Sequence, residues 1–171
     1  MRKWLLIVLL LAIAGPAVAG FREDLRQALE QTKLVLNNRP SYEQYLQSAG
    51  QVTSALDAVI YSRTAVPANA LVAVKFVNKQ LRAFEEAWAL RFRIGLKNSD
   101  SPDNVSFTRA SLSRVSKAFA AIDPKLRVEE YFIGQGEIGK EEYRTIAYAQ
   151  LLGASARIII RNIDTAVARL R

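Results

Sequence analysis

Apolar residues recur three and four positions apart along nearly the whole chain from residue 21 onward. This spacing matches the turn of an α-helix, whereas a half-buried strand alternates every second residue. No series of segments shows the two-residue alternation. The pattern therefore predicts an all-α fold. Its clearest stripe is Tyr42, Tyr45, Ala49, Val52, Leu56 and Val59.

Polar stretches, prolines and glycines divide the pattern into separate helices. Ser41 and Gln44 have the spacing of a capping box and mark the start of the second helix. Short connections favour antiparallel neighbours, so we expect an up-down antiparallel bundle of four helices plus one extra helical segment, in a single domain. That domain covers residues 20–171. The five helices are expected at about 21–37, from 41 through 59, from 67 to 95, from 105 to 122, and from 140 to the carboxyl terminus.

Two of these helices carry informative seams, which are rows of apolar residues that face neighbouring helices. In the third, the seam ends with Phe84 and Trp88, which we expect to be buried between helices. Together with Tyr42 and Tyr45, these rings could also form a ligand-stacking cage, but their seam positions favour core packing. The last helix has two parallel apolar lines, which predict neighbours on more than one side. The lines are Leu152, Ala156, Ile159, Ile163, Ala166 and Leu170, and Ala147, Leu151, Ala154 and Ile158.

Residues 1–19 have the pattern of a cleavable signal peptide. Arg2 and Lys3 precede an apolar run that ends at Gly15, and residues 17–19 read Ala-Val-Ala, a small-x-small cleavage site. The alternative is an uncleaved anchor, but the run is shorter than the roughly 20 residues that span a bilayer. We therefore expect export to the periplasm, a lumen or the outside, with residues 1–19 removed.

The composition excludes several kinds of catalysis. The chain has no cysteine and no histidine, so it has no thiolate nucleophile, no imidazole base and no Cys- or His-based metal site. Its paired acids are adjacent in sequence, and adjacent residues on a helix do not face one another. We expect no enzyme, no metal and no cofactor. The pairs are Glu23-Asp24, Glu85-Glu86, Glu129-Glu130 and Glu141-Glu142.

Two short motifs have ordinary explanations. Gly134, Gly136 and Gly139 read G-x-G-x-x-G, but a dinucleotide site needs a strand before them and a parallel sheet around them. The preceding residues 127–133 could pass as a short strand, yet the surrounding segments are helical. We expect a turn before the last helix and no bound nucleotide. Residues 104–106 match a glycosylation acceptor, and the pair Asp103-Asn104 is equally well read as the cap of the fourth helix.

Basic residues give the chain its candidate partner surface. The whole sequence has a net charge of +8, and without Arg2 and Lys3 it retains 22 basic and 16 acidic residues, a net charge of +6. The cations that share helix faces are Lys75, Lys79 and Arg82, and Arg157 and Arg161. They form either a solvated outer face or a docking surface for an acidic protein or lipid. Nucleic acid is not an expected partner in an exported compartment.

In outline the chain resembles the PsbQ-like luminal extrinsic subunits of photosystem II, through its signal-bearing helical architecture and the run SKAFAAID at residues 116–123. The long apolar helix at the end departs from that family. The resemblance implies a non-catalytic accessory protein that docks on a membrane complex, with a thylakoid lumen as one candidate compartment. The alternative is a periplasmic chaperone or secretion-system component that binds hydrophobic clients through a partly exposed last helix.

Overall fold

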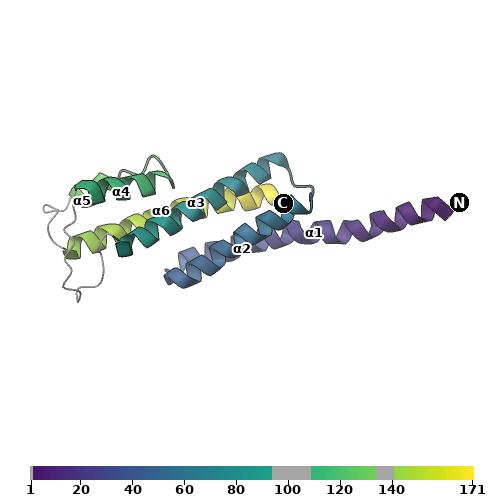
Figure 1. Cartoon of the computed structure of the whole chain (residues 1–171), viewed down its shortest axis with the longest axis horizontal. Coiled ribbons are helices and arrows are strands. Elements are labelled where there is room, and N and C mark those ends of the chain that lie inside the picture. Colours follow the sequence, from purple (N-terminus) through teal and green to yellow (C-terminus); the bar gives the residue numbers. More distant parts are fainter. Residues whose placement is uncertain (1, 94–108, 134–140) are drawn as a thin grey trace. The chain divides into compact units, whose positions relative to one another are not determined.

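The computed structural model describes residues 2–93, 109–133 and 141–171, with side chains for residues 20–92, 110–132 and 144–171. In these residues it contains six helices and no strand, which confirms the all-α prediction (Figure 1). The helices are α1 (Arg2–Asn37), α2 (Tyr42–Tyr61), α3 (Ala68–Arg93), α4 (Arg109–Ala120), α5 (Val128–Ile133) and α6 (Glu141–Leu170).

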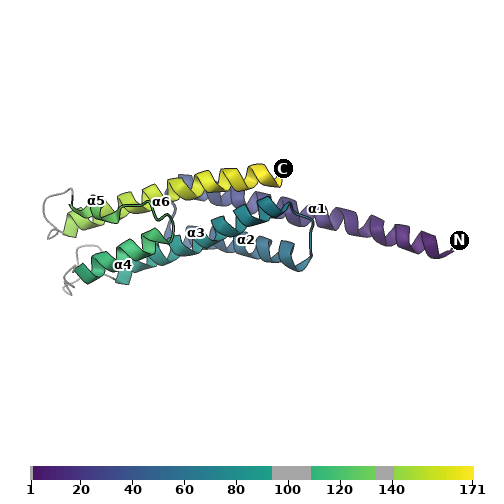
Figure 2. The same ribbon diagram turned by 90° about the horizontal axis from the view of Figure 1, so that it is seen from above.

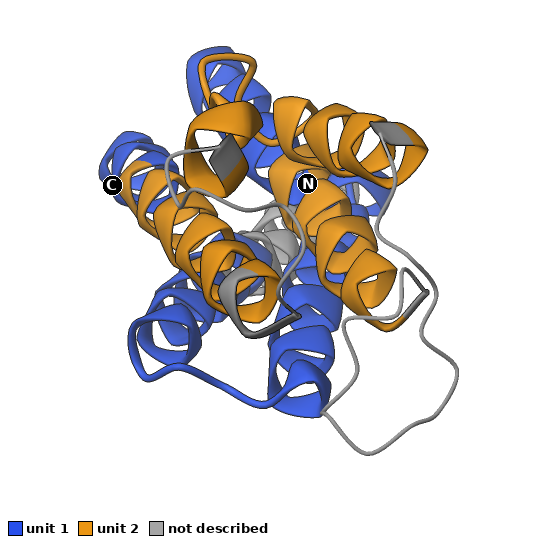
Figure 3. Cartoon of the chain, turned by 90° about the vertical axis from the view of Figure 1, so that its left-hand side faces the viewer, with its two compact units in different colours: residues 1–78, 162–171 blue, residues 79–161 orange. Residues whose placement is uncertain are grey.

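The chain divides into two compact units, which Figure 3 distinguishes by colour. Unit 1 comprises residues 1–78 and 162–171, and unit 2 comprises residues 79–161. Both α3 and α6 cross the boundary, so each contributes one part to each unit. The single domain over residues 20–171 stays a prediction.

In unit 1, α1 and α2 pack against each other as an antiparallel pair (Figures 1 and 2). The turn between them places Arg39 in the left-handed region, with φ of 48°. Ser41 then caps α2: its hydroxyl accepts a hydrogen bond from the Gln44 N–H, and the Gln44 side-chain oxygen accepts one from the Ser41 N–H. The predicted capping box is confirmed.

The core of unit 1 follows the predicted apolar spacing closely. Thr32 is buried within it, and its hydroxyl lies 2.9 Å from the Ala28 carbonyl oxygen and 3.1 Å from the Ser48 carbonyl oxygen, so it links α1 to α2. The α2 stripe is buried as predicted, except that Tyr42 is half-buried. The largest apolar side chains of this core are Leu25, Leu29, Leu36, Tyr45, Val52, Leu56, Val59, Val74, Val77, Ile163, Val167 and Leu170.

Polar contacts connect the end of α6 to α1 within unit 1. The Arg22 guanidinium donates a hydrogen bond to the Leu170 carbonyl oxygen at 2.6 Å. The Lys33 ammonium forms an ion pair with the Asp164 carboxylate. Because Ile163 and Leu170 are buried beside these contacts, α6 is both packed and tied at its carboxyl end.

In unit 2, α4 packs against α5, and aromatic rings fill the interior. The Phe119 and Tyr148 rings meet edge to face, with centroids 5.4 Å apart. The Tyr148 hydroxyl donates to the Ala87 carbonyl oxygen, and burial raises the pKa of Tyr148. The buried Gln80 amide donates to the Ile122 carbonyl oxygen at 2.8 Å. These bonds satisfy polar groups that would be costly to bury alone.

The helix boundaries correct the sequence prediction in two places. The α1 backbone is helical from Arg2, not from about residue 21, because Leu and Ala, both strong helix formers, dominate the positions around Gly15 and Pro16. Residues 128–133, which lie outside the five helices expected from the sequence, form a sixth helix, with Val128 and Phe132 buried one turn apart. The signal peptide over residues 1–19 stays a prediction.

Two predictions about motifs fall on residues that lie outside the described ones. These are the glycine-rich turn at 134–140 and the glycosylation acceptor at 104–106. The helix at 128–133 nevertheless bears on the first of them. A dinucleotide-binding turn follows a strand, and here a helix precedes the glycines.

Candidate docking faces

The three cations predicted on α3 are all exposed. Steps of four and three residues place Lys75, Lys79 and Arg82 on one side of this continuous helix. Lys75 belongs to unit 1, and the other two belong to unit 2. In the described part of the chain no ion pair engages any of them, although Glu86 lies four residues after Arg82.

The part of α3 before Glu85 carries positive charge and no acid of its own. The helix has no aspartate or glutamate from Ala68 to Phe84. Like charges in one row repel each other by a few tenths of a kcal/mol per pair, so such a row gains nothing for the helix itself. An anionic partner would turn the same arrangement into an attraction.

The two cations predicted on α6 are also exposed. Arg157 and Arg161 lie one helical turn apart in unit 2. Between Tyr143 and Ile163 the α6 sequence contains no acidic residue. This pair therefore places exposed positive charge on a second helix.

Two of the acidic pairs contain a carboxyl whose hydrogen bonds lower its pKa. Among the described residues no group of three or more acidic side chains gathers in a way that could hold a metal ion. Glu23 accepts hydrogen bonds from Arg26, which has the larger effect, and from Gln27. These bonds lower the pKa of its carboxyl to about 2. Bonds from its own backbone N–H and from the Ser116 hydroxyl lower the pKa of Glu129. A carboxylate of lowered pKa stays ionised near neutral pH and is a poor proton donor there.

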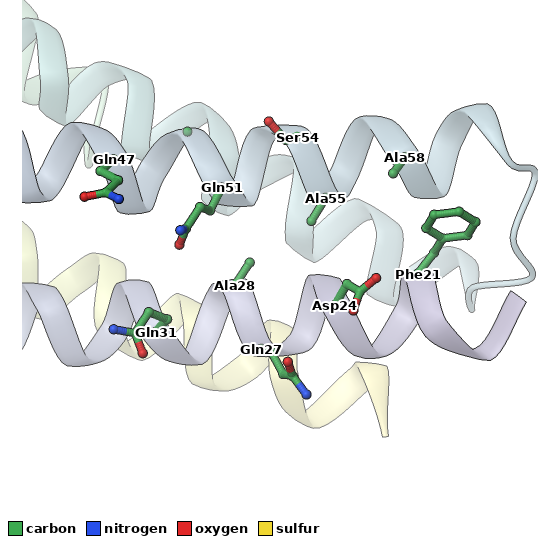
Figure 4. Close-up of a pocket in the computed structure, with 11 residues that line it drawn as sticks. Phe21, Asp24, Gln27, Ala28, Gln31, Gln47, Gln51, Ser54, Ala55 and Ala58 are labelled. Atoms are coloured by element: carbon green, nitrogen blue, oxygen red, sulfur yellow. The ribbon is translucent and has the colours of Figure 1, made fainter. Parts of the chain in front are cut away.

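An open groove of about 800 Å³ runs between α1 and α2 in unit 1 (Figure 4). Five of its lining residues are small, namely Ala28, Gly50, Ser54, Ala55 and Ala58. A Cβ added at Gly50 would meet no atom within 4 Å. Asp24 is its one acidic lining residue. A second groove of about 490 Å³ shares Gln31, Gln47 and Gln51 with it. The first groove is lined by Phe21, Asp24, Gln27, Ala28, Gln31, Gln47, Gly50, Gln51, Ser54, Ala55 and Ala58.

The aromatic residues considered for a cage belong to the packing of their units. Tyr45 is fully buried in unit 1, and Phe84 is only 2% exposed in unit 2. The Phe84 and Trp88 rings meet edge to face at 5.5 Å. Trp88 itself is half-buried, so the prediction that it is buried like Phe84 is wrong in degree. Because its ring is larger, the same seam position covers a smaller fraction of it.

In residues 20–92, 110–132 and 144–171, whose side chains the structure describes, none of the helices has the length and apolar content that a bilayer crossing requires. Comparisons with known proteins add no relative. No family model matches the chain, and no characterised protein and no solved structure matches it either. The basis for a function is therefore the chemistry of the described surfaces.

One surface feature was missed by the sequence interpretation. Val72 and Phe76 were not assigned a place, and both are largely exposed on α3. Their positions are four residues apart and are offset from the buried residues Val74 and Val77. That offset from the seam is the signal that could have found them.

Proposed function

We propose that this chain is a non-catalytic, extracytoplasmic accessory protein that docks on a membrane-associated protein complex. The observation that carries the proposal is the acid-free row of exposed, unpaired cations on α3. On α6, Arg157 and Arg161 add two further exposed cations, one helical turn apart. The partner chemistry that fits these residues is an acidic protein surface, and neither nucleotide nor nucleic acid is required. A PsbQ-like role in a thylakoid lumen is one context of this kind.

The alternative of a chaperone for hydrophobic clients has less support. It requires the broad apolar stripe of α6 to be partly exposed. Most of that stripe is buried, including Leu151, Ile159 and Ile163. Ile146 remains 47% exposed, but one isoleucine offers little surface to an unfolded client. The basic faces therefore support docking better than client binding.

The extracytoplasmic location rests on the signal-like sequence of residues 1–19. We expect the mature protein from its native host to begin at Gly20, after cleavage at Ala19. Intact-mass measurement of the purified protein checks this result. A mature form that still contains Trp4 would overturn the cleavage and would favour a retained anchor.

Reversing the α3 charges provides the direct test of docking. The variant Lys75→Glu/Lys79→Glu/Arg82→Glu should bind native membranes at least about tenfold more weakly, because it replaces three attractions of up to about 1 kcal/mol each with repulsions. Charge effects at exposed sites reach about 8–10 Å at ordinary salt, so wild-type binding should weaken as salt rises. Quantitative co-sedimentation at low and high salt measures both effects.

A matched control separates a specific face from overall charge. Arg114, Lys117 and Lys125 are also exposed, and reversing them to Glu changes the net charge by the same amount. This control should retain most of the binding. Equal binding by the wild type and the α3 variant at low salt would reduce the row to a solvated helix face. Equal losses in the two variants would show that net charge alone drives the association.

A further inference from the structure

Unit 1 exposes two large apolar side chains one turn apart near the start of α3. Val72 is 66% exposed and Phe76 is 51% exposed, whereas Val74 and Val77 on the core side are fully buried. The core of unit 1 is therefore already filled by α3 without them. A single exposed apolar residue is ordinary. Two in one row leave an apolar strip that the unit itself does not cover.

Cations flank this strip on two helices of the same unit. Lys75 is exposed on α3 three residues after Val72, and so lies on the same side of the helix. On α6, the Arg169 guanidinium donates to the Asn69 carbonyl oxygen at 3.3 Å, which brings its charge to the turn of α3 before Val72. We name the surface formed by Val72, Lys75, Phe76 and Arg169 the α3–α6 face. All four residues lie in unit 1.

Nearby acids do not neutralise these cations. The unit 1 part of α3 has no aspartate or glutamate. On the unit 1 part of α6 the acidic side chain is Asp164, and its carboxylate is paired with Lys33. The other acids of unit 1 belong to α1, where Arg26 pairs with Glu23 and Glu30, and to α2.

We propose that the α3–α6 face binds an anionic lipid bilayer. Val72 and Phe76 would enter the boundary between headgroups and acyl chains, while the Lys75 and Arg169 side chains reach the phosphates. Negatively charged lipids are the matching partner because the face carries cations and no free acid. This inference rests on the proposed function, since Lys75 belongs to both surfaces, and it names the membrane lipid as a second contact.

The shape of the surface favours a bilayer over a peptide. The described grooves of unit 1 are lined by residues from α1, α2 and the turn between them, and none of the four residues of the α3–α6 face lines either groove. A peptide gains affinity by entering a groove, whereas a helix side with apolar and basic residues suits a planar interface. An acidic protein remains the competing occupant, and the experiment separates the two.

The test uses the full mature chain and lipid vesicles made with or without phosphatidylglycerol in phosphatidylcholine. The wild type should sediment with the anionic vesicles at least about tenfold more tightly than with the neutral ones. Val72→Ser/Phe76→Ser should weaken binding to anionic vesicles by at least about tenfold, at high salt as well as low, because apolar insertion is not screened. Lys75→Glu/Arg169→Glu should abolish the preference for anionic lipid.

Leu34→Ser is the matched control, because Leu34 is 56% exposed on α1 in the same unit but lies outside the face. It should bind vesicles like the wild type, and thermal melts should show all variants folded. No binding of the wild type to anionic vesicles would overturn the proposal, as would full binding by Val72→Ser/Phe76→Ser. The wild type could instead bind native membranes, lose that binding when the membranes are treated with protease, and not bind vesicles. This result would retain protein docking and reject the lipid contact. A wild type that binds neither native membranes nor anionic vesicles would reject both the protein docking and the lipid contact.

Discussion

Replacing Phe84 by alanine is expected to destabilise the protein by about 3–5 kcal/mol. The side chain is 2% exposed, and its ring packs edge to face on Trp88. Truncation removes the ring from water-free surroundings and leaves a cavity that the neighbours fill only in part. Since a domain of this kind is stable by roughly 5–15 kcal/mol, the loss should be obvious in urea unfolding.

Phe76→Ala is the control for this prediction, because it removes the same ring from the same helix at a position that is 51% exposed. Its effect on the free energy of unfolding should stay within about 0.5 kcal/mol. Trp88→Ala should fall between the two, since its ring is half-buried. Similar losses at Phe84 and Phe76 would contradict the assigned orientation of α3.

These three positions show what the sequence could and could not predict about packing. Spacing alone places Phe84 and Trp88 on the core side of a helix, and it correctly predicts the burial of Phe84. Spacing indicates which side of the helix faces the core, and not how much of each side chain is covered. How far a side chain is covered depends on which neighbours reach it, and periodicity contains no information about those neighbours.

The short helix α5 shows the same limit at the level of an element. Its six residues include Val128 and Phe132, whose spacing of four matches one helical turn. A segment of that length can also be read as a strand, because so few residues do not separate the two periods. Packing against α4 selects the helix.

The candidate docking faces were predictable in one respect and not in another. The spacing of Lys75, Lys79 and Arg82 was enough to predict a shared, exposed side of α3. The exposure of Val72 and Phe76 was not predictable in the same way, because valine and phenylalanine are usually buried. Such exceptions become visible only when the buried set of the helix is known.

Leu29→Ala is expected to cost about 2–5 kcal/mol, the second large loss of stability. Leu29 is completely buried in unit 1, on the α1 side that also buries Leu25 and Thr32. Leu34→Ala deletes the same atoms from the same helix at a position that is 56% exposed, so its cost should stay within about 0.5 kcal/mol.

Chemical unfolding followed by circular dichroism gives both values, and the difference between the two variants cancels their shared change in helix propensity. A large loss for Leu34→Ala with little for Leu29→Ala would mean that α1 presents its other side to the core. The α1–α2 groove and the Thr32 bridge to Ser48 depend on the present orientation, so they would then be wrong as well. A large loss of stability in Leu29→Ala alone would support both the groove and the Thr32 bridge. Thr32 lies three residues from Leu29, on the same side of α1.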